Sequence, residues 1–236
     1  MKYLRSFLLG LSVLLVSCTS AEIRMNPQLK ETLRVEQEIL VVHYIASPFS
    51  AYTPEVRNAG SAGMMFGAVG GAIAGAIQAS EAETAGSQLV KEYHLEDPMP
   101  KIKHSFVESN RRSQLLQNLK PLTEALPSDD LDTLKVKLQG GYVLDFRTTA
   151  WSLTPSGPLS QNTYRVQYAG RARLLHLPEG TTEWQSFCET NGKIEDSAPT
   201  LLEVVADSGA FLKSQLDHAY KSCLAQFEMQ FTTQKP

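Results

Sequence analysis

Residues Thr163–Leu177 read TYRVQYAGRARLLHL, and apolar and polar side chains alternate along most of this run. Because successive side chains of a strand point to opposite faces, a period of two predicts a β-strand with one buried face. The face expected in the core carries Tyr164, Val166, Tyr168, Gly170, Ala172 and Leu174. The opposite face carries Arg165, Gln167, Arg171 and Arg173.

The same alternation is found on both sides of this strand. Tyr142–Ala150 precedes it, and Glu183–Thr190 follows Pro178-Glu179-Gly180-Thr181, a sequence typical of a hairpin turn. In the last segment Trp184 and Cys188 share one face. The three segments together predict a three-strand antiparallel meander.

Segments outside the meander complete the fold class. Val35–Ala46 contains the run Ile39–Ile45, which is apolar on both faces and predicts a central strand. Ser105–Ala125 and a segment from about Thr200 to Phe227 predict helices, the second with an apolar stripe that includes Cys223. The expected fold is α+β: a mostly antiparallel sheet, built from the N-terminal strand and the meander, packed against helices.

A separate Gly-rich helix is predicted over residues 59–79, where Gly63, Gly67, Gly71 and Gly75 recur every four residues. On a helix these glycines form one ridge, which lets another helix approach to backbone contact. The pattern resembles the glycine zipper of several bacterial envelope lipoproteins and membrane-associated proteins. Three alternatives remain open: a helix that packs between subunits or inserts in a membrane, a helix packed on its own domain, and a flexible loop.

The N-terminus carries a targeting signal. Lys2 and Arg5 precede the apolar run Phe7–Val16, which is too short to span a membrane and is typical of a signal peptide. Leu15-Val16-Ser17-Cys18 resembles the lipobox of bacterial lipoproteins, whose cysteine is acylated after cleavage. The alternative is a buried N-terminal helix with an incidental cysteine.

The resemblance implies a signal peptide at 1–17, a lipidated tether at 18–34 and a periplasmic α+β domain at 35–236. Acyl chains on Cys18 would anchor the chain to a membrane. Residue 19 is Thr rather than Asp. In the family, a residue other than Asp after the acylated cysteine favours passage to the outer membrane. The expected location is therefore the cell envelope, at the outer membrane and facing the periplasm.

With Cys18 acylated, Cys188 and Cys223 remain as a pair in an oxidising compartment. The strand and helix periods both direct these cysteines toward the core, so we expect a disulfide. It would close a loop of about 35 residues and contribute roughly 3–4 kcal/mol to the free energy of unfolding. Two free buried thiols or a metal site are the alternatives.

Charge and motifs exclude several classes of function. Removal of Lys2 and Arg5 changes the formal net charge from −3 to −5, which gives no general attraction to nucleic acid. No catalytic motif is found, and no cofactor or metal site is expected, because none of the five histidines pairs with another at zinc-ligand spacing. Arg165, Arg171 and Arg173 suggest either an anion site or a solvated sheet face, and Trp151 either a ligand pocket or the core.

The sequence therefore leaves three functional hypotheses. The first is a non-enzymatic, lipid-anchored envelope protein that self-associates or engages the membrane through its Gly63–Gly75 helix. The second is an accessory lipoprotein that binds a partner in a transport or secretion assembly, with the glycine helix packed on its own fold. The third, and least favoured, is an enzyme with an unfamiliar site.

Overall fold

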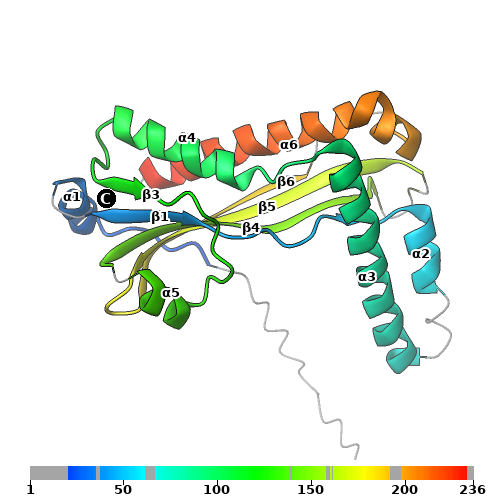
Figure 1. The fold of residues 1–236 in the computed structure, drawn as a ribbon, viewed down its shortest axis with the longest axis horizontal. Helices are drawn as coiled ribbons and strands as arrows, with labels where there is room; N and C mark the ends of the chain where they lie inside the picture. The colour runs from blue at the N-terminus through cyan, green and yellow to red at the C-terminus, as the bar shows by residue number, and fades with distance from the viewer. Residues whose placement is uncertain are drawn as a thin grey trace, which may run out of the picture.

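The computed structural model describes residues 21–35, 38–61, 67–138, 140–157, 160, 162–191 and 198–232. The predicted signal peptide, the lipobox-like sequence with Cys18, and Gly63 lie outside the described residues. Within the described part, the chain is α+β, with helices packed on a mixed sheet (Figure 1).

The elements follow one another along the chain with short connections. They are α1 (Pro27–Val35), β1 (Ile39–His43), β2 (Ser50–Ala51), α2 (Pro54–Ser61), α3 (Gly67–Tyr93), α4 (Met99–Arg112), β3 (Leu119–Pro121), α5 (Leu131–Leu138), β4 (Tyr142–Pro155), β5 (Tyr164–His176), β6 (Thr181–Asn191) and α6 (Leu201–Thr232).

The sheet has the order β3-β1-β4-β5-β6, and β2 also pairs with β4. Strands β4, β5 and β6 form the antiparallel meander that the alternation predicts. Strand β1, however, runs parallel to both β3 and β4, and β2 runs parallel to β4. The sheet is therefore mixed, and the expectation of a mostly antiparallel sheet is corrected.

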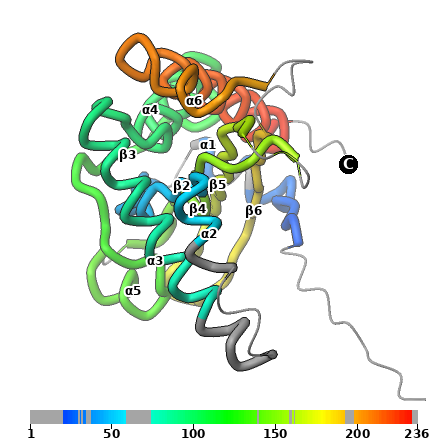
Figure 2. The backbone as a smooth tube through the Cα atoms, turned by 90° about the vertical axis from the view of Figure 1, so that its right-hand side faces the viewer, coloured from blue at the N-terminus to red at the C-terminus, as the bar shows by residue number. Residues whose placement is uncertain are grey.

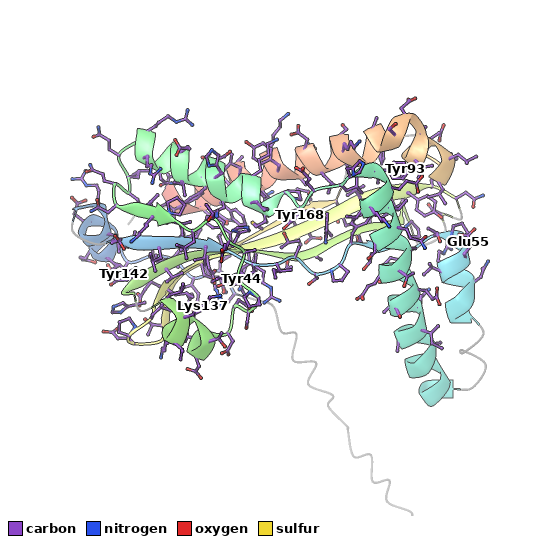
Figure 3. All side chains as sticks on the ribbon, viewed as in Figure 1. Tyr44, Glu55, Tyr93, Lys137, Tyr142 and Tyr168 are labelled. Atoms are coloured by element: carbon purple, nitrogen blue, oxygen red, sulfur yellow. A yellow bond between two sulfur atoms is a disulfide. The ribbon has the colours of Figure 1, made fainter. Side chains whose placement is uncertain are left out.

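Helices cover both faces of the sheet, and the larger of two hydrophobic clusters lies on one face (Figure 1). Helices α4 and α6 lie on one face, where they enclose the main core with the inward side chains of the meander. Helix α5 lies on the opposite face over a smaller cluster that includes Val143 and Leu175. Figure 3 shows Tyr168 on the side of α4 and α6, and Tyr44 on the side of α5.

Strand β1 is central, as its two-sided apolar pattern predicts. Ile39 and Val41 belong to the main core, whereas Val42 belongs to the cluster under α5. The strand is shorter than the predicted range Val35–Ala46, because Val35 ends α1.

Two segments differ in type from the prediction. The helix expected at Ser105–Ala125 begins earlier, at Met99, and ends at Arg112. Within the remainder of the expected range, Leu119–Pro121 forms an edge strand. Proline is compatible with an edge strand because it need not donate to a neighbour there. Residues 131–138, which precede the first strand predicted for the meander, form α5. Leu131, Leu134 and Leu138 lie on one face of this helix and pack on the sheet.

Part of the expected tether is also structured. The backbone N–H of Ile23 donates to Gln185 O at 3.0 Å, and Met25 and Leu33 are buried in the main core. The described residues of the 18–34 segment are thus attached to the domain rather than extended away from it.

Candidate interaction surface on helix α3

Helix α3 projects from the body of the fold with α2 beside it, as the two views in Figures 1 and 2 show. Its C-terminal part lies against β2, and its N-terminal part extends beyond the sheet. Within the predicted range 59–79, residues 59–61 end α2 and residues 67–79 begin α3, which continues to Tyr93. Of the four predicted packing residues, Gly67, Gly71 and Gly75 belong to α3, and Gly63 is not described.

One row of α3 is already packed within the chain. Ala74 and Ala82 are buried, and Gly86, four residues further on, approaches the Phe49 backbone. A Cβ atom on Gly86 would lie 1.8 Å from Phe49 O, so only glycine allows this contact. This row is not the predicted one, because it is offset by one residue from the row that contains Gly75.

The predicted row faces outward where its surroundings are described. A Cβ atom on Gly75 would meet no atom within 4 Å. Ala76 and Ala79 are exposed, and Ile77 is 48% exposed. The helix therefore presents a small-residue, apolar surface, hereafter the Gly75 surface (Gly75, Ala76, Ile77 and Ala79).

Such a surface permits close helix packing. A glycine without a neighbour leaves room for another backbone to approach, with dispersion and weak Cα–H···O contacts as the attraction. Among the described residues, no helix is long and apolar enough to cross a membrane.

A groove adjoins the α2–α3 pair. Its volume is about 440 Å³, and its walls come from α2, α3 and the start of α6. Val56, Leu89 and Leu201 give it apolar walls, while Glu55 and Glu81 add carboxylates; Figure 3 labels Glu55 on α2. Leu202, at the same groove, is 81% exposed.

The arginines that suggested an anion site are occupied within the chain. Arg171 Nη2 lies 2.5 Å from Asp129 Oδ2, and Arg173 Nη2 lies 2.6 Å from Asp145 Oδ2. Arg147 also pairs with Asp129. These contacts lie on the α5 side of the sheet, so Arg171 and Arg173 form an intramolecular ion-pair network rather than an open anion site.

The network changes the ionisation of Asp129. Burial alone would raise the pKa of its carboxyl group, but hydrogen bonds and charge from Arg171 and Arg147 outweigh burial and lower the pKa to about 2. Arg165 stands farther along β5, opposite Thr154, and does not belong to this network as the structure describes it.

A second polar pair is buried on the other face of the sheet. Lys103 Nζ lies 3.0 Å from His43 Nδ1 and donates to Leu122 O at 2.6 Å. Burial, followed by the Lys103 charge, lowers the pKa of His43 to about 4. No sequence motif marks this pair; the one signal is that His43 points to the same face of β1 as the core residues Ile39 and Val41.

A cleft of about 300 Å³ between the α3–α4 connection and α6 gathers titratable groups from distant segments. It is lined by His94, Glu96, Asp97, Pro98, Lys101, Lys213, Leu216, Asp217 and Tyr220. Two of its carboxylates already have partners in the chain. Asp97 accepts hydrogen bonds from Thr148 Oγ1 and Met99 N, and Asp217 pairs with Lys101 at 3.1 Å.

The cysteines and Trp151 have structural positions. Cys188 Sγ and Cys223 Sγ are joined at 2.04 Å, which links β6 to α6 in the main core. Trp151 Nε1 donates to Ser47 O at 2.6 Å, and its ring packs edge-on against Phe49. Trp151 thus belongs to the core and lines none of the clefts described above.

Comparisons with known proteins found solved structures only. No family model matches the sequence, and no curated protein matches it. A PelC dodecamer from Paraburkholderia phytofirmans is similar at 11% identity and a TM-score of 0.39, covering 91% of this chain and 97% of that chain. A putative neuraminyllactose-binding hemagglutinin homolog from Helicobacter pylori shows 9% identity and a TM-score of 0.36, with coverages of 85% and 84%.

Lipoprotein GNA1162 from Neisseria meningitidis shows 14% identity and a TM-score of 0.23, covering 79% of this chain and 99% of that chain. These similarities are too low to assign a function. Function is therefore inferred from this chain's own residues.

Proposed function

We propose that this chain is a lipid-anchored, non-enzymatic protein of the bacterial envelope that self-associates through the Gly75 surface of α3. Acyl chains on Cys18 would hold it to the outer membrane, with the α+β domain in the periplasm. In this proposal α3 of one copy packs against α3 of another, and the lipid anchor confines the copies to one plane.

The observation that carries the proposal is the difference between the two rows of α3. The row of Ala74, Ala82 and Gly86 is packed within its own chain. Apart from the neighbouring backbone of α3 itself, no atom of the described residues lies within 4 Å of a Cβ atom placed on Gly75, although glycine weakens a helix by about 1 kcal/mol relative to alanine. A contact with another copy gives the glycine row a physical role.

Cross-linking of the lipidated protein in membranes tests the proposal. Gly75→Leu should abolish or strongly reduce the oligomer while leaving the monomer folded, because the added side chain meets open space. Gly67→Leu/Gly71→Leu should have the same effect on assembly.

Ser87→Leu is the matched control. Ser87 is an exposed residue of the same helix, twelve positions from Gly75 and therefore about 18 Å along the axis and about 120° around it. The Ser87→Leu variant should assemble like the wild type. Unchanged cross-linking of Gly75→Leu would contradict the proposal.

A second candidate function is that of an accessory lipoprotein that binds a different protein of a transport or secretion assembly. The groove between α2, α3 and α6 favours it, since exposed Leu202 and the neighbouring carboxylates suit an apolar, basic segment. A monomeric lipoprotein that co-purifies with one stoichiometric partner, and loses it in Leu202→Asp, would support this function over self-association.

A further inference from the structure

The turn between β5 and β6 brings one histidine and one glutamate together. Gly180 N donates to His176 O at 2.9 Å, and Gly180 has φ +74°, a conformation that favours glycine. The tight turn directs Glu179 back over the end of β5. His176 Nδ1 consequently lies 3.2 Å from Glu179 Oε2.

A β-bulge adds a second glutamate at the same place. Leu175 pairs with Thr182, but Leu174 pairs with Trp184, so Glu183 is an extra residue with no partner on β5. A bulge re-aims the side chain of the extra residue. The donor atoms of His176, Glu179 and Glu183 all lie within 4.8 Å of one another.

The histidine ring is held in position by a neighbour. Tyr142 pairs with His176 across β4 and β5, and the two rings stack with centroids 4.5 Å apart at an interplanar angle of 15°. Figure 3 shows Tyr142 at this end of the sheet. A fixed imidazole is a preorganised ligand, since little side-chain freedom is lost when it binds.

The spacing of the donors suits a small cation. Bonds of about 2.1 Å in a tetrahedral zinc site place ligand atoms about 3.4 Å apart. The His176–Glu179 distance of 3.2 Å already agrees with that value, and the side chain of Glu179, 68% exposed, is free to adjust. Three protein donors would leave a position for water.

The local charge also favours a cation. Within the described residues, no lysine or arginine pairs with Glu179 or Glu183. Glu179 instead lies beside His176, which is charged only when protonated. One lysine approaches the turn: Lys135 Nζ would lie 2.8 Å from a Cβ atom on Gly180. Its charge should weaken, but not cancel, the attraction of two carboxylates.

We propose that His176, Glu179 and Glu183 form a binding site for one divalent transition-metal cation, of which Zn²⁺ is the best match. An imidazole with two carboxylates is a donor set that suits zinc better than calcium or magnesium, which prefer oxygen ligands alone. The site has one histidine and depends on a turn and a bulge, so no pair of histidines at zinc-ligand spacing marks it in the sequence.

Calorimetric titration of the full chain, purified without a histidine tag, with Zn²⁺ tests the site. The wild type should bind one equivalent saturably, and His176→Gln and Glu183→Gln should each weaken binding at least about tenfold. Lys135→Gln should tighten it, because a neighbouring positive charge is removed. Co²⁺ should give visible absorption bands that are lost in His176→Gln.

Glu189→Gln, on the same strand β6, is the matched control and should bind Zn²⁺ like the wild type. Circular dichroism should show that each variant is folded, and Glu183→Gln tests the site independently of the Tyr142–His176 ring contact. Absence of saturable Zn²⁺ binding by the wild type would overturn the proposal. Equal Zn²⁺ affinity of the wild type, His176→Gln and Glu183→Gln would also overturn it.

Discussion

In the body of the fold, α6 packs large side chains against the meander, whereas the buried row of α3 (Ala74, Ala82 and Gly86) consists of small residues. Trp184 meets Phe231 edge-on with ring centroids 5.0 Å apart, and Phe106 meets Phe146 at 5.3 Å. In α3, by contrast, Ala82 is buried and Gly86 approaches the Phe49 backbone too closely for any larger residue. Substitutions that remove side-chain volume should therefore destabilise the body most. Substitutions that add side-chain volume should destabilise the packing of α3 most.

The largest expected effect concerns the body. Cys188→Ala/Cys223→Ala removes a cross-link between residues 35 apart in the chain and should lower the free energy of unfolding by about 4 kcal/mol. Chemical denaturation under oxidising conditions measures this. Thiol labelling of the denatured, mature wild type without reductant should find no free cysteine, and two reactive thiols would refute the disulfide.

The next effect concerns the packed row of α3. Gly86→Ala places a Cβ atom 1.8 Å from Phe49 O, so either α3 or the Phe49 backbone must move. We expect a loss of up to about 3 kcal/mol in stability, the upper part of the usual overpacking range. Hydrogen exchange should become faster in α3 before it does in β5. If α3 keeps wild-type protection in Gly86→Ala, the close contact does not hold α3 to the body.

A third prediction concerns the ion pairs on the α5 side of the body. The pKa of Asp129 falls from 3.8 to about 2 on folding, so the folded state favours the ionised carboxylate. The stabilisation, about 2 kcal/mol, is complete well above pH 4 and is lost as the pH falls through about 2.

Asp129→Asn should therefore be about 2 kcal/mol less stable than the wild type at pH 7, and the difference should shrink toward pH 2. Urea denaturation across this pH range measures it. Asp132→Asn, at an exposed position on nearby α5, is the control and should show little difference. A pH-independent gap for Asp129→Asn would contradict an ionic origin.

The smallest effect sharpens the contrast within α3 itself. Gly75→Ala adds a methyl group to open space and should stabilise the monomer by up to about 1 kcal/mol through helix propensity. The same substitution should weaken assembly, since the methyl group occupies the proposed helix contact. Thermal denaturation of detergent-solubilised monomer, alongside membrane cross-linking, separates the two effects. A destabilised monomer would show that Gly75 packs within its own chain.

Local patterns predicted the parts of the fold that repeat. The alternation in β5 and its neighbours gave the meander, and the two-sided apolar run of β1 gave a central strand. Strand β3 and helix α5 could not be predicted in this way, because Leu119–Pro121 is only three residues long and α5 has eight. Elements this short have too few residues to show a period, and their structure depends on the sheet they pack against.

The candidate sites show the same difference between local sequence patterns and contacts between distant segments. The four-residue glycine period is visible in the sequence, but whether a row faces inward or outward depends on contacts such as that between Gly86 and Phe49. Likewise, Arg171 and Arg173 are visible as charges, but Asp129 and Asp145 reach them from other segments of the chain. The orientation of the glycine row and the ion pairing of the arginines both depend on contacts between residues that are far apart in sequence.

By itself, the sequence determined the α+β class, the meander, the inward positions of both domain cysteines and the resemblance of the N-terminus to a lipobox, because each follows from side-chain periodicity or a short contiguous motif. Only the tertiary structure decided the parallel placement of β1, the ion-paired state of the arginines, the outward orientation of Gly75 and the meeting of His176 with Glu183. These features depend on distances between segments, which no local pattern of residues encodes.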